Sequence, residues 1–451
     1  MNILLLLAGF RAWSGSPVEA LTRVFCAVSL FALEMQLVTW TGAATLSSLV
    51  PVNAVIAAGL FVWLRRRDRN RVAGTPTAAT ASRQWLPFAA IGALVLLLNG
   101  ALPLEAADPY HLERIGRIQQ LGTLAYDRNA DARGNVMGWL YELALADLGA
   151  LPGAGSTALK FHGIIGLGLY ALTAAAVFEI VGPALPPASW LLAVIPVAFH
   201  QLVMVKNDLF GAVPAALVLA WVAARSRDAL PGEGAWAGWL TGIAVGIKMT
   251  SFPIALVFAG ALVADHRRNA RLLSLSLAGA IVGLISAGVL FLLVENDAVY
   301  GSSVGPYAEL GNRTAGIGEA AVSLSRFAIS LVDMGMVTRN VWPGRGGWGG
   351  TYGLPVVWGL CVLACAWRTP LAQRTLIACG VYWVAFASVY PDADVAHRLG
   401  LAPGVVALGA AAALVDREPS VPRWLRRLAW PVVILSGLQI VRSAVLYLSR
   451  G

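Results

Sequence analysis

The sequence has little charge for its length. Only 13% of its 451 residues are charged and 58% are hydrophobic, whereas a soluble domain carries roughly 25% charged residues. So few charges argue against a soluble globular protein. Apolar runs of about 17 to 25 residues recur along the chain, and each is long enough to cross a bilayer as a helix. The composition therefore predicts an all-α polytopic membrane protein.

Cysteine and lysine are also scarce. The four cysteines are Cys26, Cys361, Cys365 and Cys379. All four lie in apolar runs, where they are expected to be small buried hydrophobic side chains rather than a disulfide framework or a metal site. Most of the arginines lie in short loops, and no basic face with interleaved aromatic residues is present. The net charge of +9 is therefore assigned to membrane orientation, and nucleic-acid binding is excluded.

About thirteen apolar segments are predicted to be helices. They are 22–42, 46–64, 85–104, 158–181, 186–204, 208–224, 234–249, 251–264, 272–294, 352–368, 375–390, 400–415 and 428–448. The pair 234–249 and 251–264 is short, and forms either two thin helices or one broken helix. The predicted fold is a bundle of about 11 to 13 transmembrane helices with an amphipathic helix on its non-cytoplasmic surface.

The basic loops predict the orientation of this bundle. Five of them fall on one side of the thirteen-span arrangement: 65–71, 225–228, 265–271, 368–374 and 416–427. An excess of arginine marks the cytoplasmic side. The opposite side then receives the two long loops, 105–157 and 295–351.

Three regions follow from this arrangement. Residues 1–72 are predicted to form an N-terminal membrane hairpin, and 73–84 a flexible cytoplasmic linker. Residues 85–451 form the main bundle with its two external loops. The hairpin contains Glu34 in the middle of a span, where a carboxyl group needs a partner or a proton.

Ionisable residues gather directly after the third apolar segment. Asp108 precedes Pro109, which can open a helix as its first residue, so Asp108 can cap a helix that follows. In that helix Leu112, Ile115, Ile118 and Leu121 recur at helical spacing, and Glu113, Arg114 and Arg117 lie away from this stripe. A flat amphipathic helix on the bilayer fits the pattern. From spacing alone, a simple cap on a solvated helix and a reaction centre are equally good interpretations.

Two further places on the same side carry isolated charges. Lys206 and Asp208 lie at a tight corner between two spans, and Lys248 follows an apolar, glycine-rich run. A lone ammonium group there costs a few kcal/mol unless it reaches water or an anion. Snorkelling lysines and a helix-capping aspartate are the structural alternative.

A late external loop, 390–400, contains Asp392, Asp394, His397 and Arg398. Arg398 has the planar donor geometry that suits a phosphate group. The two aspartates, spaced two apart, provide the oxygen ligands that a hard divalent cation prefers, although carboxylates are common in solvated loops. A metal ion is therefore left open, and no other cofactor is expected.

Together these residues describe a non-cytoplasmic pocket with carboxylates and cations at helix ends. That combination suits a lipid-phosphate substrate that enters from the bilayer. A cation can neutralise the phosphate leaving group, and a carboxylate can take a proton from an acceptor hydroxyl.

The layout resembles that of the GT-C superfamily of integral-membrane glycosyltransferases, which includes the protein O-mannosyltransferases and the aminoarabinose transferase of lipid A. The resemblance covers roughly residues 85–405. It rests on an Asp in the loop "DPYHLERIGRIQQLGTLAYD", the "KND" corner at 206–208, the segment "WAGWLTGIAVGIK" at 236–248 and the late "AHRLGLAPGV" at 396–405.

The resemblance implies transfer of a sugar from a polyprenyl-phosphate donor to a hydroxyl acceptor on the non-cytoplasmic side. By the same resemblance, the catalytic carboxylates are Asp108 and Asp208. The donor phosphate would be contacted by residues of the first loop, the corner, the end of the glycine-rich run and the late loop, namely Lys248, Arg398, Lys206, His397, Arg114 and Arg117. Tyr110, Trp342 and Trp348 are expected to contact the substrate, although tryptophans in such a loop also anchor at the membrane interface.

Two other functions remain open. A transporter or flippase of lipid-linked sugars is favoured by Glu34 and by the interrupted region 234–264, although no internal repeat is visible. The third hypothesis is a scaffold subunit without activity of its own. In the scaffold, Asp108 would be replaceable without loss of activity.

Overall fold

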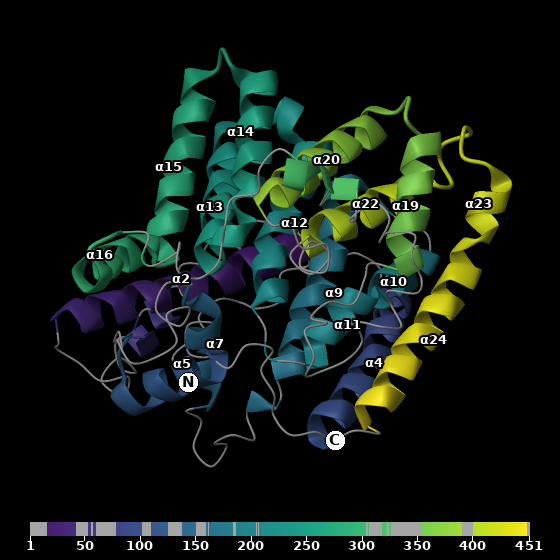
Figure 1. Ribbon diagram of the computed structural model, residues 1–451. Helices are drawn as coiled ribbons and strands as arrows, with labels where there is room; N and C mark the ends of the chain where they lie inside the picture. Colours follow the sequence, from purple (N-terminus) through teal and green to yellow (C-terminus); the bar gives the residue numbers. More distant parts are fainter. Residues whose placement is uncertain are drawn as a thin grey trace.

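The computed structural model describes residues 16–41, 53–55, 57–59, 78–101, 110–124, 138–149, 159–160, 162–183, 186–203, 205, 207–303, 305, 318–322, 324–325, 353–389 and 400–448. Within these ranges the chain forms helices and no β-strand (Figure 1). The all-α prediction is therefore confirmed for the described part of the chain.

The helices follow the apolar runs of the sequence. In the first half they are α2 (Pro17–Thr41), α4 (Ala78–Ala101), α5 (Tyr110–Leu121), α7 (Leu140–Gly149), α9 (His162–Val181), α10 (Pro186–Ala193), α11 (Pro196–Val203) and α12 (Asp208–Ala224). In the second half they are α13 (Pro231–Ile247), α14 (Pro253–His266), α15 (Ala270–Ser286), α16 (Val289–Tyr300), α19 (Gly353–Cys365), α20 (Pro370–Val389), α22 (Leu401–Leu414), α23 (Arg423–Arg427) and α24 (Ala429–Leu448). Short 3-10 turns, Ser226–Asp228 and Met249–Ser251, follow α12 and α13.

Helices α12 and α22 form the centre of the bundle (Figure 1). Every residue of α22 is buried, as is every residue of α12 up to Ala223. A helix that is apolar on all sides is stable only where other helices surround it. Helices α9, α13, α14 and α20 pack around α12, so the first residue of α12, Asp208, is held at a fixed place at one end of this core.

Close packing of α13 on α15 depends on glycines. Gly234, Gly238, Gly242 and Gly246 recur every four residues and therefore share one face of α13. A Cβ atom added at Gly238 would lie 2.1 Å from the backbone oxygen of Ser276 on α15. The two backbones are thus in direct contact, a type of packing that small residues make available within a bilayer.

Two predicted segments differ from the structure in their continuity, and for a third region the structure selects between the two predicted alternatives. The segment 186–204 is divided into α10 and α11, because Pro196 opens a new helix and has no N–H to continue the old one. The segment 272–294 is divided into α15 and α16, which are bent by 54° at Gly288, where φ is +87° and a residue with a Cβ atom would be strained. The segments 234–249 and 251–264 are two separate helices, α13 and α14.

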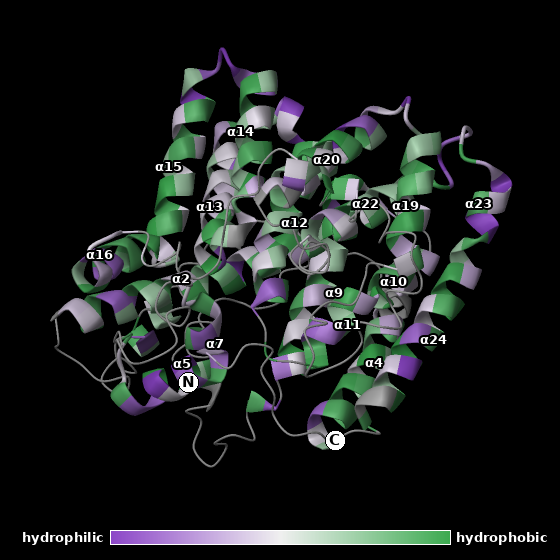
Figure 2. Ribbon diagram, in the orientation of Figure 1, coloured by the Kyte–Doolittle hydropathy of each residue, from purple (hydrophilic) through white to green (hydrophobic). Residues whose placement is uncertain are grey.

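Several helices have the length and composition of membrane spans. Among the described residues three helices qualify, Pro17–Trp40, His162–Val181 and Arg423–Val445, and the bent pair α15 and α16 would be a fourth. Apolar side chains also point outward: on α24, Ile434, Leu438, Val441 and Val445 are exposed at helical spacing, and Figure 2 shows α15 and α24 as mainly hydrophobic. A face of this kind is typical of a surface that contacts lipid. The total of about 11 to 13 spans stays a prediction.

The described basic loops gather at one end of the bundle. Arg374, at the start of α20, contacts Asp265 at the end of α14 and Ser226 after α12, and Arg225 donates a hydrogen bond to the backbone oxygen of Glu179 near the end of α9 (3.3 Å). The starts of α9 and α12 and the end of α13 therefore lie at the other end. This is the alternation that the sequence predicted for the loops 225–228, 265–271 and 368–374.

The predicted regions 1–72 and 73–84 are described only in part. Helix α2 packs directly against α9, α15 and α7, and α4 begins at Ala78, inside the predicted linker. Most of the predicted second hairpin helix, 46–64, lies outside the described residues.

Candidate functional site

The end of the bundle opposite the basic loops contains two buried polar clusters. The first, named the Glu142 cluster, joins His111 and Arg114 of α5 to Glu142 of α7. The second, named the Lys248 cluster, joins Asn207 and Asp208 at the start of α12 to Lys248 at the end of α13.

In the Glu142 cluster one carboxylate lies beside an imidazole ring and a guanidinium group. His111 donates from Nδ1 to Oε1 of Glu142 (2.6 Å), and Nη1 of Arg114 lies 3.4 Å from the same oxygen. None of the three side chains is more than 2% exposed. The other carboxylate oxygen, Oε2, is buried and accepts no hydrogen bond from the described residues. The cluster therefore contains one buried acceptor atom, Oε2 of Glu142, that could accept a further hydrogen bond.

Arg114 is held from several directions. Its Nη1 donates to the backbone oxygen of Gly138 (2.8 Å), and its Cζ lies 4.2 Å from the ring centre of Trp139 and 5.7 Å from that of Tyr110. These contacts combine a charge-assisted hydrogen bond with cation–π attraction. The guanidinium group thus orients α5 against the backbone that leads into α7.

The charge state of Glu142 follows from these contacts. Burial alone would raise the pKa of the carboxyl group, but the charge of Arg114 and the hydrogen bond from His111 outweigh it. The pKa of Glu142 is therefore held below its usual range. At neutral pH the cluster contains a carboxylate, and the hydrogen bond from His111 is charge-assisted.

The Lys248 cluster joins two helix ends of opposite polarity. The ammonium group of Lys248 contacts Oδ1 of Asp208 and lies 3.1 Å from Oδ1 of Asn207. The C-terminal end of a helix favours a cation and the N-terminal end favours an anion. Lys248 directly follows α13 and Asp208 begins α12, so each charge is placed where its own helix stabilises it.

Both charges of this cluster are removed from solvent. The side chain of Lys248 is 10% exposed and that of Asp208 is 1% exposed. The side-chain nitrogen of Asn207 is also buried and donates no hydrogen bond to the described residues. Because both charges are buried, a ligand that takes the ammonium group away from Asp208 would change the energy of both.

Gly138 connects the two clusters. Its backbone oxygen binds Arg114 of the Glu142 cluster. A Cβ atom added to Gly138 would lie 2.1 Å from the backbone oxygen of Gly246 and 2.5 Å from that of Ile247, directly before Lys248. Only glycine permits this approach. The two clusters therefore form one site at the junction of α5, α7, α12 and α13.

A narrow apolar cleft lies beside this site. It has a volume of about 50 Å³ and lies between α7, α9, α11 and α12. Its lining includes Tyr141, His162, Gln201, Leu209 and Phe210. The Tyr141 ring centre is 6.3 Å from that of His111 and 5.8 Å from that of Phe210. The cleft thus borders both clusters.

The structure brings some of the predicted site residues together. Asp208 and Lys248, which are 40 positions apart in the sequence, form an ion pair. Tyr110 is buried at the start of α5, with its ring centre 4.1 Å from that of His111. Arg117 is not part of either cluster: its Nε lies 4.0 Å from Glu113, one turn earlier on α5. Six predicted residues lie outside the described residues: Asp108, Lys206, Trp342, Trp348, His397 and Arg398.

The predicted orientation of α5 is wrong in one respect. Arg114 was expected to lie away from the buried stripe, but it is fully buried, whereas Leu121 of the predicted stripe is 55% exposed. The reason is that α7 supplies the carboxylate of Glu142 and the residue before α7, Trp139, supplies an aromatic ring for the guanidinium group. Apolar periodicity within α5 contains no information about these partners.

The sequence pattern did not predict Glu142, His111 or Asn207 as site residues. A signal for Glu142 was present, because it is a single carboxylate in the apolar stretch "WLYELAL", and such a group needs a partner. For metal binding, the described ranges contain no group of three His, Cys, Asp or Glu side chains arranged to hold an ion. Asp392 and Asp394 lie outside these ranges.

Comparison with known proteins adds no relative to this description. No protein-family model, curated protein or solved structure matches the chain significantly.

Proposed function

We propose that this chain is an integral-membrane glycosyltransferase of the GT-C type. It transfers a sugar from a polyprenyl-phosphate donor to a hydroxyl acceptor on the non-cytoplasmic face of the membrane. The observation that carries the proposal is the buried Lys248 cluster, which places an ammonium group and a carboxylate at the end of the bundle opposite the basic loops. The excess of arginine at the other end supports a non-cytoplasmic position for the site.

Lys248 is the proposed contact for the donor phosphate. Its ammonium group is a compact point charge on a flexible stem, so it can turn from Asp208 to a phosphate oxygen. In a dry site this interaction is stronger than in water. Neutralising the phosphate makes it a better leaving group, which lowers the barrier to cleavage of the sugar–phosphate bond.

The proposed reaction is a displacement at the anomeric carbon. The acceptor oxygen forms a bond to that carbon while the bond to the phosphate oxygen breaks, and polyprenyl phosphate leaves with both electrons of the broken bond. The hydroxyl proton passes to a carboxylate, for which Asp108 is the proposed general base. Asp208 is the second candidate, because its carboxylate contacts the ammonium group that is proposed to bind the phosphate.

The Glu142 cluster is proposed to hold α5 in position for this reaction. Asp108 stands two residues before Tyr110 in the sequence, and Tyr110, His111 and Arg114 are all buried on the inner side of α5. In this proposal His111, Arg114 and Glu142 are positioning residues. The apolar cleft beside Phe210 lies where the first units of a prenyl chain would approach, and it would have to widen to admit them, because about 50 Å³ holds only a few atoms.

The test is sugar transfer by the full chain in proteoliposomes. Labelled polyprenyl-phosphate sugars are offered as a panel, and wild type is compared with Lys248→Gln, Asp108→Asn and Asp208→Asn. Loss of the phosphate contact or of the base is expected to lower the rate by roughly 100-fold or more. Matched controls are Arg268→Gln and Asp297→Asn, which remove one exposed charge of each sign outside the site. Both controls are expected to retain transfer.

Two results would contradict the proposal. One is that folded wild type consumes no donor of the panel. The other is that all three site variants transfer sugar at the rate of the controls.

A flippase of lipid-linked sugars is the second candidate, favoured by two observations. Helices α15 and α16 form a broken pair bent by 54°, and both carboxylate oxygens of Glu34 are buried within α2. Transporters place ionisable groups on interrupted helices within the bilayer. A fluorescent polyprenyl-linked sugar that crosses the liposome bilayer without being consumed would favour the flippase over the transferase.

A further inference from the structure

A second binding surface lies at the basic end of the bundle, away from the site described above. It is a groove of about 390 Å³ between α14 and α20, with Val222 of α12 at its floor. One wall belongs to α14 and includes Leu256, Gly260 and Asp265, and the other belongs to α20 and includes Arg374, Ile377 and Val381.

The walls of the groove are apolar and open to the outside. Leu256 is 50% exposed, Ile377 58% and Val381 43%. Small residues in the lining, such as Gly260 on α14 and Ala378 on α20, leave the space between the walls unfilled. From Leu256 to Asp265 the groove follows α14 for about 13 Å along the helix axis. It therefore has the form of a channel for an extended hydrocarbon chain.

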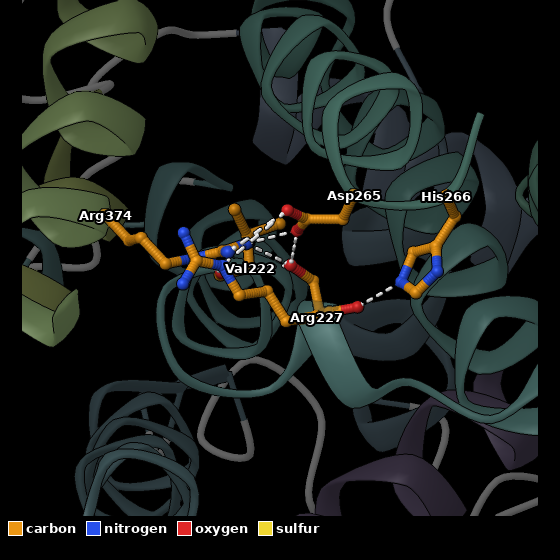
Figure 3. A network of polar contacts seen from close by, with 6 residues as sticks. Val222, Arg227, Asp265, His266 and Arg374 are labelled. Atoms are coloured by element: carbon orange, nitrogen blue, oxygen red, sulfur yellow. Dashed lines mark hydrogen bonds and ion pairs between the residues drawn. The ribbon is translucent and has the colours of Figure 1, made fainter.

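Charged side chains occupy only the end of the groove nearest the basic loops. Arg374 contacts the carboxylate of Asp265 and the hydroxyl of Ser226, and its Nε donates to the backbone oxygen of Val222 (3.0 Å). Figure 3 shows Arg374 and Asp265 reaching toward each other from different helices, with Arg227 close by. Arg374 is thus fixed in position across the head of the groove.

Arg227 is the accessible cation at this place. Its side chain is 66% exposed, and its Nε lies 4.0 Å from Oδ1 of Asp265. Arg227 and Arg374 also border a second hollow of about 470 Å³ toward the end of α9. Two guanidinium groups therefore stand where the apolar groove meets a wider polar opening.

The charge at the head of the groove is positive. Burial acts to raise the pKa of Asp265, but its hydrogen bonds from Arg374 and Ser226 and the charges of Arg374 and Arg227 hold that pKa below its usual range. The groove lining contains one carboxylate and two guanidinium groups, and the second hollow adds the carboxylate of Asp228. The exposed Arg267 and Arg268 follow directly in the next loop. A ligand with an anionic head and an apolar chain is complementary to this surface.

We propose that the groove binds an anionic phospholipid of the cytoplasmic leaflet. Its phosphate contacts Arg227 and Arg374, and one acyl chain lies between α14 and α20. Anionic lipids are attracted to basic segments at the cytoplasmic surface, which is where the excess of arginine places this end of the bundle. The bound lipid joins α12, α14 and α20 at one end. This proposal is independent of the transferase function, because the two sites lie at opposite ends.

The test uses the full chain, purified in detergent and examined by native mass spectrometry. Palmitoyl-oleoyl phosphatidylglycerol and palmitoyl-oleoyl phosphatidylcholine are added in equal amounts, and a second series adds an equal amount of a polyprenyl phosphate. Two variants address the two halves of the groove. Arg227→Gln removes the accessible charge, and Gly260→Leu fills the apolar part, since a Cβ atom at Gly260 meets nothing within 4 Å.

Matched controls separate the groove from general effects. Arg423→Gln removes an exposed arginine of α23, in another basic loop and outside the lining of both hollows. Gly168→Leu places the same side chain on α9, where a Cβ atom also meets nothing within 4 Å. Both leucine variants replace an exposed helical glycine, so neither is expected to prevent folding.

The expected result is retention of phosphatidylglycerol in preference to phosphatidylcholine by wild type and both controls. Arg227→Gln is expected to weaken this retention about fivefold, as for the loss of one basic contact near a membrane surface, and Gly260→Leu to abolish it. Equal retention of the two lipids, or equal losses in variants and controls, would overturn the proposal. Stronger retention of a polyprenyl phosphate that depends on Gly260 would overturn it too, because the groove would then hold the carrier lipid.

Discussion

The ion pair between Lys248 and Asp208 offers the sharpest prediction about this protein. Its two side chains are only 10% and 1% exposed. Removing one member of such a pair takes away the opposite charge that contacts the other, which for a buried pair costs roughly 3–5 kcal/mol of stability. Removing both charges together avoids that penalty. The variants are Lys248→Gln, Asp208→Asn and their combination.

The stability of the four proteins forms a double-mutant cycle. Each single variant is expected to lower the free energy of unfolding by roughly 3–5 kcal/mol, whereas the combined variant should lie within about 1 kcal/mol of wild type. Denaturant titration in detergent micelles measures these values. If the effects of the two single variants simply added up in the combined variant, Lys248 and Asp208 would not stabilise each other and the reasoning would be wrong.

The rate of sugar transfer shows whether the ion pair takes part in the reaction or only stabilises the fold. The combined variant is expected to fold but to transfer sugar at least about 100-fold more slowly, because no ammonium group remains for the phosphate. A control pair at the opposite end, Glu19 and Arg23 of α2, can be neutralised in the same way and should leave transfer unchanged. Full transfer by the combined Lys248 and Asp208 variant would show that the pair only stabilises the fold.

Three further predictions concern other parts of the fold. Folding lowers the pKa of Glu142, so its charged form stabilises the protein at pH values above about 4.5, the pKa in the unfolded chain, and this stabilisation is lost as the pH falls through the pKa of the folded protein. Glu142→Gln should therefore lower the free energy of unfolding near pH 7 by roughly 3–5 kcal/mol. In thermal unfolding scans the difference between variant and wild type should shrink near pH 3. Gly238→Ala should destabilise the protein by roughly 1–3 kcal/mol because its Cβ atom would collide with α15. The control Gly232→Ala, on the same helix with open space around it, should be neutral or slightly stabilising. Equal denaturation midpoints for the two variants would contradict the close packing of α13 on α15. An epitope inserted after Arg268 should be protected from external protease in intact cells and one inserted after Gly149 should be cleaved; the reverse pattern would invert the assignment of the two ends.

Hydrophobic patterning predicted the helices well where one apolar run forms one straight helix. The spans that become α9, α12, α22 and α24 are examples, because their burial or lipid contact extends around most of the helix. It predicted less well where backbone geometry intervenes. Pro196 and Gly288 interrupt apolar runs that hydropathy alone reads as continuous, because hydropathy contains no term for a missing N–H or a left-handed φ.

The sequence by itself determined the class of helical bundle, the gathering of basic loops at one end, and the choice of Asp208 and Lys248 as unusual charges. These properties depend on composition and on order along the chain. Only the tertiary structure decided which charges meet. Glu142 receives His111 and Arg114, and Asp208 receives Lys248, because helix packing brings together residues 28 to 40 positions apart. The energy of a buried charge is set by such neighbours, and no local pattern in the sequence specifies them.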